Sequence, residues 1–257
     1  MRLKDKVILV TGSTTGIGEA IARRVWQEGA KLVIHGRDAE RGHAIATELG
    51  ERAAFVSGDL ADPEFPALLI QSTAKAFGRL DCLVNNAAYV VRSDIVSTDV
   101  ALFDRVMAIN VRAPFLLIQA ALPLLKQSRG CILNIGSINA YSGEGNLLAY
   151  SVSKGALMTL SRNVANALCT ESVRITHFNV GWVLTSNEYQ HKLKDGLSAD
   201  WPETLPPEIA PSGRLIQPEE IAGAAVYWLS DESRPISGSV IDLEQYSFVG
   251  RNPTKQR

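Results

Sequence analysis

Two residues of this chain, Tyr150 and Lys154, have the types and the spacing that proton transfer requires. On a helix, residues four apart lie on one face. A phenol has a reference pKa of about 10, and a nearby ammonium group stabilises its phenolate, so the pair can exchange a proton nearer to neutral pH. Ser137, thirteen residues before Tyr150, could hydrogen-bond an oxygen of the reacting molecule. The same residue types also occur on half-exposed helix faces and in plain turns. Other segments of the chain must therefore show whether these three residues form an active site.

A glycine-rich segment at residues 11–18 lies between an apolar run that predicts a strand and a stretch that predicts a helix. Glycines let the backbone approach a ligand closely, and N–H groups at a helix start can face a diphosphate. This position favours a dinucleotide turn over a turn without ligand, although three residues separate Gly12 from Gly16 and the pattern is not G-x-G-x-x-G. The predicted dinucleotide contacts here are Gly12, Thr14, Thr15, Gly16, Ile17 and Gly18.

Short apolar runs alternate with helical segments along the chain, which predicts an α/β fold: a doubly wound, Rossmann-type parallel sheet of about seven strands, with helices on both faces. Residues 1–257 are expected to form a single domain. The strands are predicted at 7–11, 31–35, 53–57, 82–85, 131–136, 174–179 and 239–242, and the helices at 18–28, 39–49, 66–77, 101–126, 150–169 and 218–230. Residues 185–217 fall outside the alternation and are interpreted as a mobile insert over the substrate.

The residues after three further predicted strands extend the dinucleotide site. The second strand is followed by Gly36 and Arg37, which favours NADP(H), because an arginine can bind a 2′-phosphate that a carboxylate would repel. Arg37 could instead be a solvated residue beside Asp38 as a helix cap. Asp59 could accept a hydrogen bond from the adenine or cap the next helix. Further predicted contacts are Leu60, Asn86 and Ala87.

Composition excludes several other functions. Lys plus Arg number 26 and Asp plus Glu 27, without long runs of either sign, which argues against nucleic acid as a partner. The four histidines and three cysteines lack metal-ligand spacing, so no metal is expected. Scattered cysteines and the absence of a signal peptide or an apolar span favour a cytoplasmic protein that does not bind membranes.

Together these motifs resemble the short-chain dehydrogenase/reductase (SDR) family over nearly the whole chain. The resemblance rests on the T-G-x-x-x-G-x-G turn, the Asn-Asn-Ala segment at 85–87 and the Tyr-x-x-x-Lys pair. It implies NAD(P) as cofactor, with Tyr150 as acid or base and Asn110, Ser137 and Lys154 in support. Asn110 would hold a bend in its helix and a water molecule that links Lys154 to solvent.

The chain departs from the family pattern at two places. Val180-Gly181 stands where the family usually has Pro-Gly, and Ala88 replaces a glycine after Asn-Asn-Ala. The loop after the sixth strand should still meet the nicotinamide, through Gly181, Val183 and Thr185. Neither departure removes a chemical group.

The insert carries many hydrogen-bonding side chains and the aromatic residues Tyr189 and Trp201, with Trp182 nearby. Sugars, sugar acids and polyols need such groups, so a carbohydrate-like alcohol is the favoured substrate, bound by Ser137, Asn139, Tyr150 and Trp182. Two alternatives remain open: a reductase of an apolar ketone or 3-oxoacyl thioester, and a protein that senses the dinucleotide without turnover.

The resemblance also implies a homo-oligomer, a dimer or tetramer. The apolar faces of the predicted helices at 101–126 and 150–169 would suit subunit contact. The tail from residue 242 to Arg257, with Arg251, could pack on a neighbouring subunit.

Overall fold

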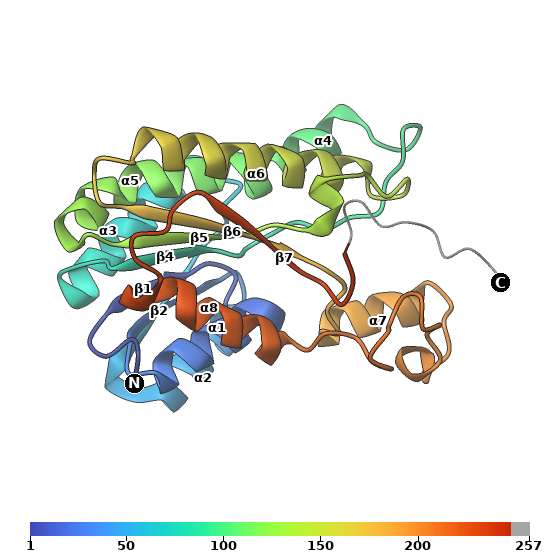
Figure 1. Ribbon diagram of the computed structural model, residues 1–257, viewed down its shortest axis with the longest axis horizontal. Helices are drawn as coiled ribbons and strands as arrows, with labels where there is room; N and C mark the ends of the chain where they lie inside the picture. The colour runs from blue at the N-terminus through green and yellow to red at the C-terminus, as the bar shows by residue number, and fades with distance from the viewer. Residues whose placement is uncertain (248–257) are drawn as a thin grey trace.

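A single parallel sheet organises the computed structural model, which describes residues 1–247 (Figure 1). Its strand order is β3–β2–β1–β4–β5–β6–β7. The prediction of a doubly wound sheet of about seven strands is therefore confirmed. The strands are β1 (Val7–Val10), β2 (Lys31–Gly36), β3 (Ala53–Ser57), β4 (Cys82–Asn85), β5 (Cys131–Ile135), β6 (Arg174–Val180) and β7 (Ser239–Leu243).

Helices cover both faces of the sheet (Figure 1). One face carries α1 (Gly16–Gln27), α2 (Ala39–Leu49) and α8 (Pro218–Leu229). The other carries α3 (Phe65–Phe77), α5 (Ala113–Ser128) and α6 (Leu148–Ala167). These bounds agree with the predicted helices to within about two residues, apart from the predicted helix at 101–126.

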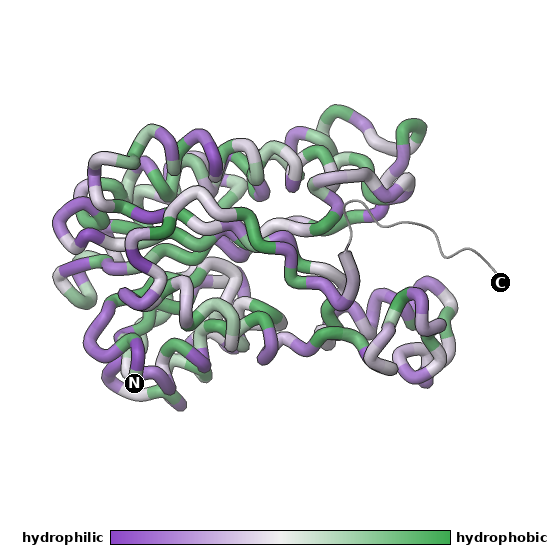
Figure 2. The backbone as a smooth tube through the Cα atoms, in the orientation of Figure 1, coloured by the Kyte–Doolittle hydropathy of each residue, from purple (hydrophilic) through white to green (hydrophobic). Residues whose placement is uncertain are grey.

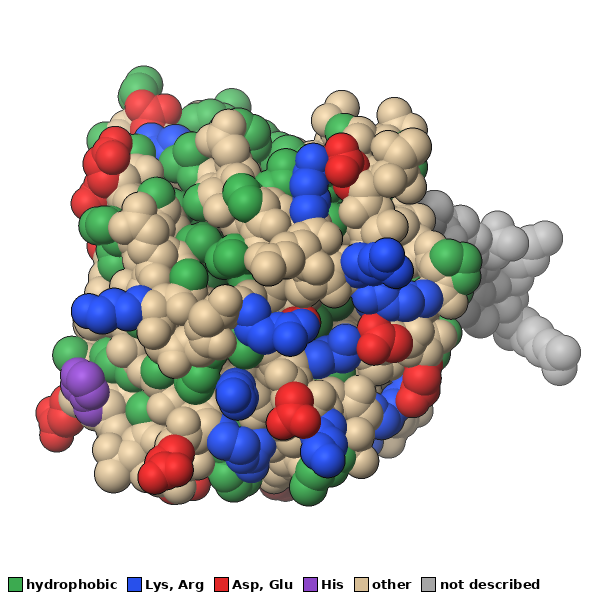
Figure 3. All heavy atoms as spheres, turned by 90° about the vertical axis from the view of Figure 1, so that its left-hand side faces the viewer, with side chains coloured by type: hydrophobic (Ala, Val, Ile, Leu, Met, Phe, Trp, Pro, Cys, Tyr) green, Lys and Arg blue, Asp and Glu red, His purple; other side chains and the backbone are tan. Residues whose placement is uncertain are grey.

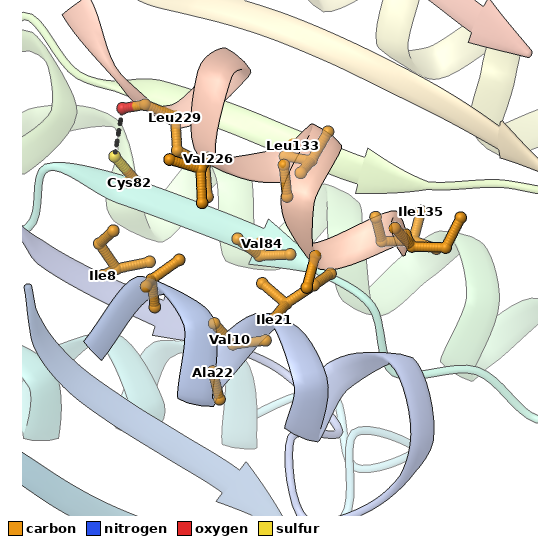
Figure 4. Packing of buried hydrophobic residues seen from close by; sticks show 14 of the residues in the cluster. Ile8, Val10, Ile21, Ala22, Cys82, Val84, Leu133, Ile135, Val226 and Leu229 are labelled. Carbon is orange, nitrogen blue, oxygen red and sulfur yellow. Dashed lines mark hydrogen bonds between the residues drawn. The ribbon is translucent and has the colours of Figure 1, made fainter. Parts of the chain in front are cut away.

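The central strands are buried on both faces, which explains why β1 is apolar throughout and β4 and β5 are apolar except for Asn85 and Asn134. In β1, Ile8 and Val10 pack toward α1 and α8, whereas Leu9 packs into the opposite layer. Figure 4 shows the first of these clusters, in which the thiol of Cys82 donates a hydrogen bond to the Leu229 carbonyl at 3.5 Å. Figure 2 shows the hydrophobic residues concentrated on these strands.

The strand order reverses between β1 and β4, which lie side by side. Connections from neighbouring strands then leave toward opposite faces, and a crevice opens at the carboxyl ends of the strands. The glycine-rich turn follows β1, residues 86–88 follow β4, Ser137 follows β5 and Gly181 follows β6. The sheet thus brings the predicted site residues to one edge.

The predicted helix over 101–126 is present as one helical segment of 29 residues, 100–128, but a π-helical turn interrupts its α-helical hydrogen bonding. The segment consists of α4 (Val100–Met107), a π-helical turn (Ala108–Arg112) and α5. Pro114 has no N–H group for the carbonyl four residues earlier, and a π-turn accommodates such a break. The side chain of Asn110 also binds segments distant in sequence, which holds the turn in place.

Judged only by its length and composition, this 29-residue helical segment, 100–128, is long and apolar enough to cross a membrane. Half of its most apolar window is buried in the protein. Leu117, Ala121 and Leu125 belong to the core on the α3 side of the sheet. This burial is the pattern of a core helix.

The insert at 185–217 is folded. It contains α7 (Ser186–Lys194) and a short 3-10 helix (Trp201–Glu203). Trp201 is 2% exposed, and its ring stacks on Trp182 at 5.4 Å and on Tyr189 at 6.3 Å between centroids. The insert projects beside the carboxyl edge of the sheet (Figure 1), and Figure 2 shows hydrophilic and hydrophobic residues mixed along it.

Two neighbouring leucines of α3 test the assignment of the core. Leu69 is 0% exposed and Leu68 is 53% exposed. Leu69→Ala should lower the free energy of unfolding by about 3 kcal/mol, because it leaves a cavity, while Leu68→Ala should change it by less than about 0.5 kcal/mol. Urea denaturation followed by circular dichroism at one protein concentration measures both. Equal losses for the two variants would contradict the assigned packing of α3.

Candidate active site

The glycine-rich turn is built for close approach of another backbone. Gly12 and Gly16 have φ of +61° and +56°, in the left-handed region. A Cβ on Gly12 would lie 2.8 Å from the Cα of Ala87, and a Cβ on Gly18 would lie 2.2 Å from the Gly12 carbonyl oxygen. The Asn86 amide donates to the Thr11 and Gly12 carbonyls at 2.9 and 3.1 Å. Asn86 therefore holds the turn through its side chain.

His35 packs against the glycine-rich turn and hydrogen-bonds it. No sequence motif singles out this residue. Its Nδ1 accepts from the Gly12 N–H at 3.2 Å, and its Nε2 lies 3.3 Å from the Gly58 carbonyl oxygen. Burial lowers the pKa of His35 to about 4. The neutral ring can therefore accept at Nδ1 and donate at Nε2, as both contacts require.

The start of α1 fits a dinucleotide diphosphate. The N-cap residue Thr15 makes no side-chain capping bond, so within residues 1–247 no side chain replaces the missing partners of the first N–H groups. Arg41 lies beside this turn, with its Nε bonded to the Thr14 carbonyl and its Nη2 2.7 Å from Glu19 Oε2. The sequence analysis did not identify Arg41 either.

The structure distinguishes among the other predicted adenosine contacts. Arg37 is exposed directly after β2, and Asp38 caps α2 by accepting from the Arg41 N–H at 3.0 Å. Asp59 accepts from the Ala61 N–H at 2.9 Å and does not cap α3, whose N-cap residue is Glu64. The Leu60 side chain is in the core, so only its backbone can face a cofactor.

Lys154 is 2% exposed and lies behind Tyr150 on α6. Its Nζ donates to the carbonyl of Ile135, the last residue of β5, at 2.7 Å and lies 5.5 Å from the Tyr150 ring centroid. Burial lowers the pKa of Lys154 to about 8. The helical spacing thus brings the two side chains together, as predicted.

Burial also raises the pKa of Tyr150 to about 12, with a hydrogen bond to Ser137 acting in the opposite direction and the charge of Glu188 adding to the rise. The phenol is therefore protonated at neutral pH in the protein alone. It can give its proton to an oxygen in the pocket, whereas acting as a base requires further positive charge nearby.

Asn110 occupies the π-turn, so the predicted bend is present. Its Oδ1 accepts from the Tyr89 N–H at 2.7 Å, and its Nδ2 donates to the Tyr89 carbonyl and to Ser153 Oγ at 3.1 and 3.0 Å. Ser153 directly precedes Lys154. Asn110 therefore ties the segment after β4 to the helix that carries the Tyr-Lys pair.

A chain of buried polar side chains lies behind Ser137. The His177 ring packs under Gly136, where a Cβ would lie 2.1 Å from Nε2. Burial, together with the charge of Lys154, lowers the pKa of His177 to about 4, so the ring is neutral. Distances of 2.8–3.0 Å join the members, which are Asn85, Asn134, Ser161, His177 and Asn179.

A cavity of about 780 Å³ extends from Ile17 at the start of α1 past Tyr150 to the insert. Among the predicted site residues it is lined by Ile17, Ser137, Asn139, Tyr150, Gly181, Trp182, Val183 and Thr185. The sequence analysis did not place Val90, Val91, Arg92, Glu244 or Tyr246 here, although all of them line the cavity. They lie on loops far apart in sequence that meet at the carboxyl edge of the sheet. Arg251 and the rest of the predicted tail beyond residue 247 lie outside the described residues.

The loop after β6 closes against the end of the sheet. A Cβ on Gly181 would lie 2.0 Å from Glu244 Oε2, so Glu244 occupies the space that a side chain would need. Thr185 caps α7 by accepting from the Glu188 N–H at 3.1 Å, and its methyl group lies close to Gly16. The structure thus places this loop between the glycine-rich turn and the cavity, although Val180 replaces the family's proline.

Comparison with known proteins identifies the class. The family model described as enoyl-(acyl carrier protein) reductase matches residues 12–244. The chain is 34% identical to 2-(S)-hydroxypropyl-CoM dehydrogenase 3 of Xanthobacter autotrophicus, with 95% of this chain and 96% of that protein covered. It is 33% identical to L-fucose dehydrogenase of Mus musculus, over 90% of this chain and 84% of that protein.

The crystal structure of L-sorbose reductase from Gluconobacter frateurii, in complex with NADPH and L-sorbose, superposes with a TM-score of 0.89 at 29% identity, over 95% of this chain and 97% of the other. The chain belongs to the short-chain dehydrogenase/reductase family and is an oxidoreductase.

Gly12→Ala tests whether the turn holds the cofactor. The added methyl group meets Ala87 and requires a positive φ, so we expect the dissociation constant of NADPH to rise at least about tenfold. Titration by nucleotide fluorescence measures it. Gly223→Ala, on α8 with nothing within 4 Å of the new Cβ, is the matched control and should bind normally. Unchanged binding in Gly12→Ala would contradict the assigned contact.

Proposed function

We propose that this protein transfers hydride between NAD(P) and a CH–OH or C=O group of a neutral sugar or polyol. The observation that carries the proposal is the polar lining of the cavity around Tyr150. Hydrogen-bonding groups reach it from the insert, from the loop after β5 and from the end of the sheet, among them Asn139, Glu144, Glu188, Lys192 and Glu244. A polyhydroxylated molecule needs several such partners at once.

The bound cofactor supplies or accepts the hydride at its nicotinamide ring. In the proposed reaction Tyr150 gives its proton to the substrate oxygen during reduction and takes it back during oxidation. Ser137 holds the same oxygen. Lys154 stabilises the phenolate, and Asn110 keeps α6 in position through Ser153.

The charges around the cavity favour a neutral substrate over a sugar acid. Three cationic residues line it (Arg92, Lys192 and Lys194), against four carboxylates (Glu144, Glu188, Asp195 and Glu244). Arg92 lies 2.7 Å from Asp195, and Lys192 lies 4.0 Å from Glu188. An anionic substrate would have to compete with these carboxylates.

The comparisons support this substrate class through L-fucose dehydrogenase and L-sorbose reductase. A second candidate is the reduction of an apolar ketone or 3-oxoacyl thioester. It is favoured by the description of the matching family model and by apolar side chains in the cavity, including Val90, Val91, Ile138 and Ile209.

A substrate panel with NAD and NADP, followed by nicotinamide absorbance, tests the proposal. It contains sorbitol, xylitol, L-fucose, L-sorbose, gluconate, cyclohexanol, cyclohexanone and a steroid ketone. We expect the highest kcat/KM for a neutral polyhydroxylated compound. Faster turnover of cyclohexanone or the steroid would favour the second candidate, and cofactor binding without any turnover would favour a sensor.

We further propose a preference for NADP over NAD. A Cβ at Gly36 would lie 2.6 Å from Thr14 Cγ2, so this position has no room for the carboxylate that would bond a ribose hydroxyl and repel a 2′-phosphate. Arg37 follows and forms no ion pair within the described part of the chain.

Arg37→Gln should therefore raise the KM for NADP about 10- to 100-fold, because a charge-assisted hydrogen bond to a phosphate is lost. The KM for NAD in the same variant should change less than about threefold, and steady-state kinetics with both cofactors measures this. Parallel changes with the two cofactors would contradict the preference.

We also propose that the protein assembles as a homo-oligomer. Exposed apolar side chains on α4, α5 and α6, including Val100, Phe115 and Val152, support a homo-oligomer, a dimer or tetramer. Figure 3 shows basic and acidic side chains interspersed over one face of the molecule, which supports a protein without a nucleic-acid partner. Free thiols at Cys82, Cys131 and Cys169 support a cytoplasmic location.

A further inference from the structure

A carboxylate of the insert, Glu188, is held over the same cavity as Tyr150. It lies in the first turn of α7, where its N–H bonds Thr185 Oγ1 at 3.1 Å. Its Oε1 accepts from Trp182 Nε1 at 2.9 Å. Lys192, one helical turn later, lies 4.0 Å from the same oxygen. Both partners of the carboxylate thus lie next to the same oxygen, Oε1.

The partners of Glu188 are themselves fixed. Trp182 stacks on the buried Trp201 with an interplanar angle of 18°. The Nζ of Lys192 lies 4.8 Å from the centroid of the Trp182 ring. The carboxylate therefore does not swing freely on the surface, and its side chain is only 28% exposed. Such a preorganised acceptor discriminates between ligands better than a mobile one.

The second oxygen, Oε2, has no donor among residues 1–247. A carboxylate has about four lone-pair sites, so this oxygen retains its capacity to accept. A substrate hydroxyl in the cavity can fill that capacity. A substrate without the hydroxyl would remove water from the carboxylate and return no hydrogen bond, which strongly disfavours its binding.

Glu188 also affects the pKa of Tyr150, the proposed proton donor. Its negative charge contributes to the raised pKa of Tyr150, so the carboxylate is near enough for the phenol to respond to it. Lys192 on α7 faces Glu188, and the other titratable groups that line the same cavity are Tyr150 on α6, His191, Lys194 and Asp195 of the insert, Arg92, Glu144, Tyr246, and Glu244 from the end of β7.

We propose that Glu188 is a specificity-determining residue, whose free oxygen accepts a hydrogen bond from a second hydroxyl of the substrate while the reacting oxygen lies on Tyr150 and Ser137. The inference rests on the proposed function and names the group that would select polyhydroxylated substrates. It further implies that this same hydroxyl shields Tyr150 from the charge of Glu188.

The test compares Glu188→Gln with the wild type on two probes. One is the best polyhydroxylated substrate among sorbitol, xylitol, L-fucose and L-sorbose, and the other is the cyclohexanol/cyclohexanone pair, which has no second hydroxyl. We expect kcat/KM for the polyhydroxylated probe to fall at least about tenfold and that for the cyclohexyl probe to change less than about threefold. In the direction of carbonyl reduction the alkaline limb of the pH profile should also move to lower pH, and in the direction of alcohol oxidation the acid limb should do so, because the variant lacks a charge that contributes to the raised pKa of Tyr150.

Glu203→Gln, an exposed residue of the insert that does not line the cavity, is the matched control for loss of a charge and should match the wild type in every measurement. NADPH binding and the melting temperature of each variant verify folding. Equal effects of Glu188→Gln on the two probes, or none, would overturn the role of Glu188 and leave the proposed function intact. A wild type inactive on all four polyhydroxylated probes would overturn both.

Discussion

A buried cation, the ammonium group of Lys154, determines how the active-site edge is arranged. Its removal from water lowers its pKa to about 8, and the Ile135 carbonyl at 2.7 Å is the acceptor that offsets part of that loss. Because Ile135 ends β5, the bond fixes α6 against this strand. Tyr150, one helical turn before Lys154, is then placed beside Ser137, which follows β5 after one residue. The Lys154–Ile135 hydrogen bond thus joins the helix, the phenol and the strand end at one point.

The buried polar side chains that support the site are neutral. His177 is held neutral by burial and by the charge of Lys154 itself. His35, which lies under the glycine-rich turn, is also held neutral by burial. Asn110 connects α6 to the loop after β4 without adding charge. Apart from Lys154, the site thus has a polar base of neutral, hydrogen-bonded side chains, and its other formal charges line the cavity on the insert, on surrounding loops and at the end of the sheet.

The sequence was sufficient for the sheet and for the residues around Tyr150, because these depend on local patterns. Strands such as Val7–Val10 are continuous apolar runs, and Tyr150 and Lys154 need only a helix between them to meet. The interruption at Asn110 was implied only by the family resemblance and not by local pattern, since the partners that hold the π-turn, Tyr89 and Ser153, lie 21 and 43 residues from Asn110. The helix α7 has a polar sequence and depends on the stacked rings of Trp182, Tyr189 and Trp201. Residues such as Arg92 and Glu244 reach the cavity only through the fold.

Single-turnover hydride transfer in Tyr150→Phe is the most direct measurement of the proton-donating role at the centre of this structure. The variant is saturated with NADPH, mixed with the best carbonyl substrate, and followed by the decay of nicotinamide absorbance. If Tyr150 supplies the proton, the rate should fall about 1,000-fold while the dissociation constant of NADPH stays within about threefold of the wild type. A variant that keeps its rate within tenfold would show that another group protonates the substrate.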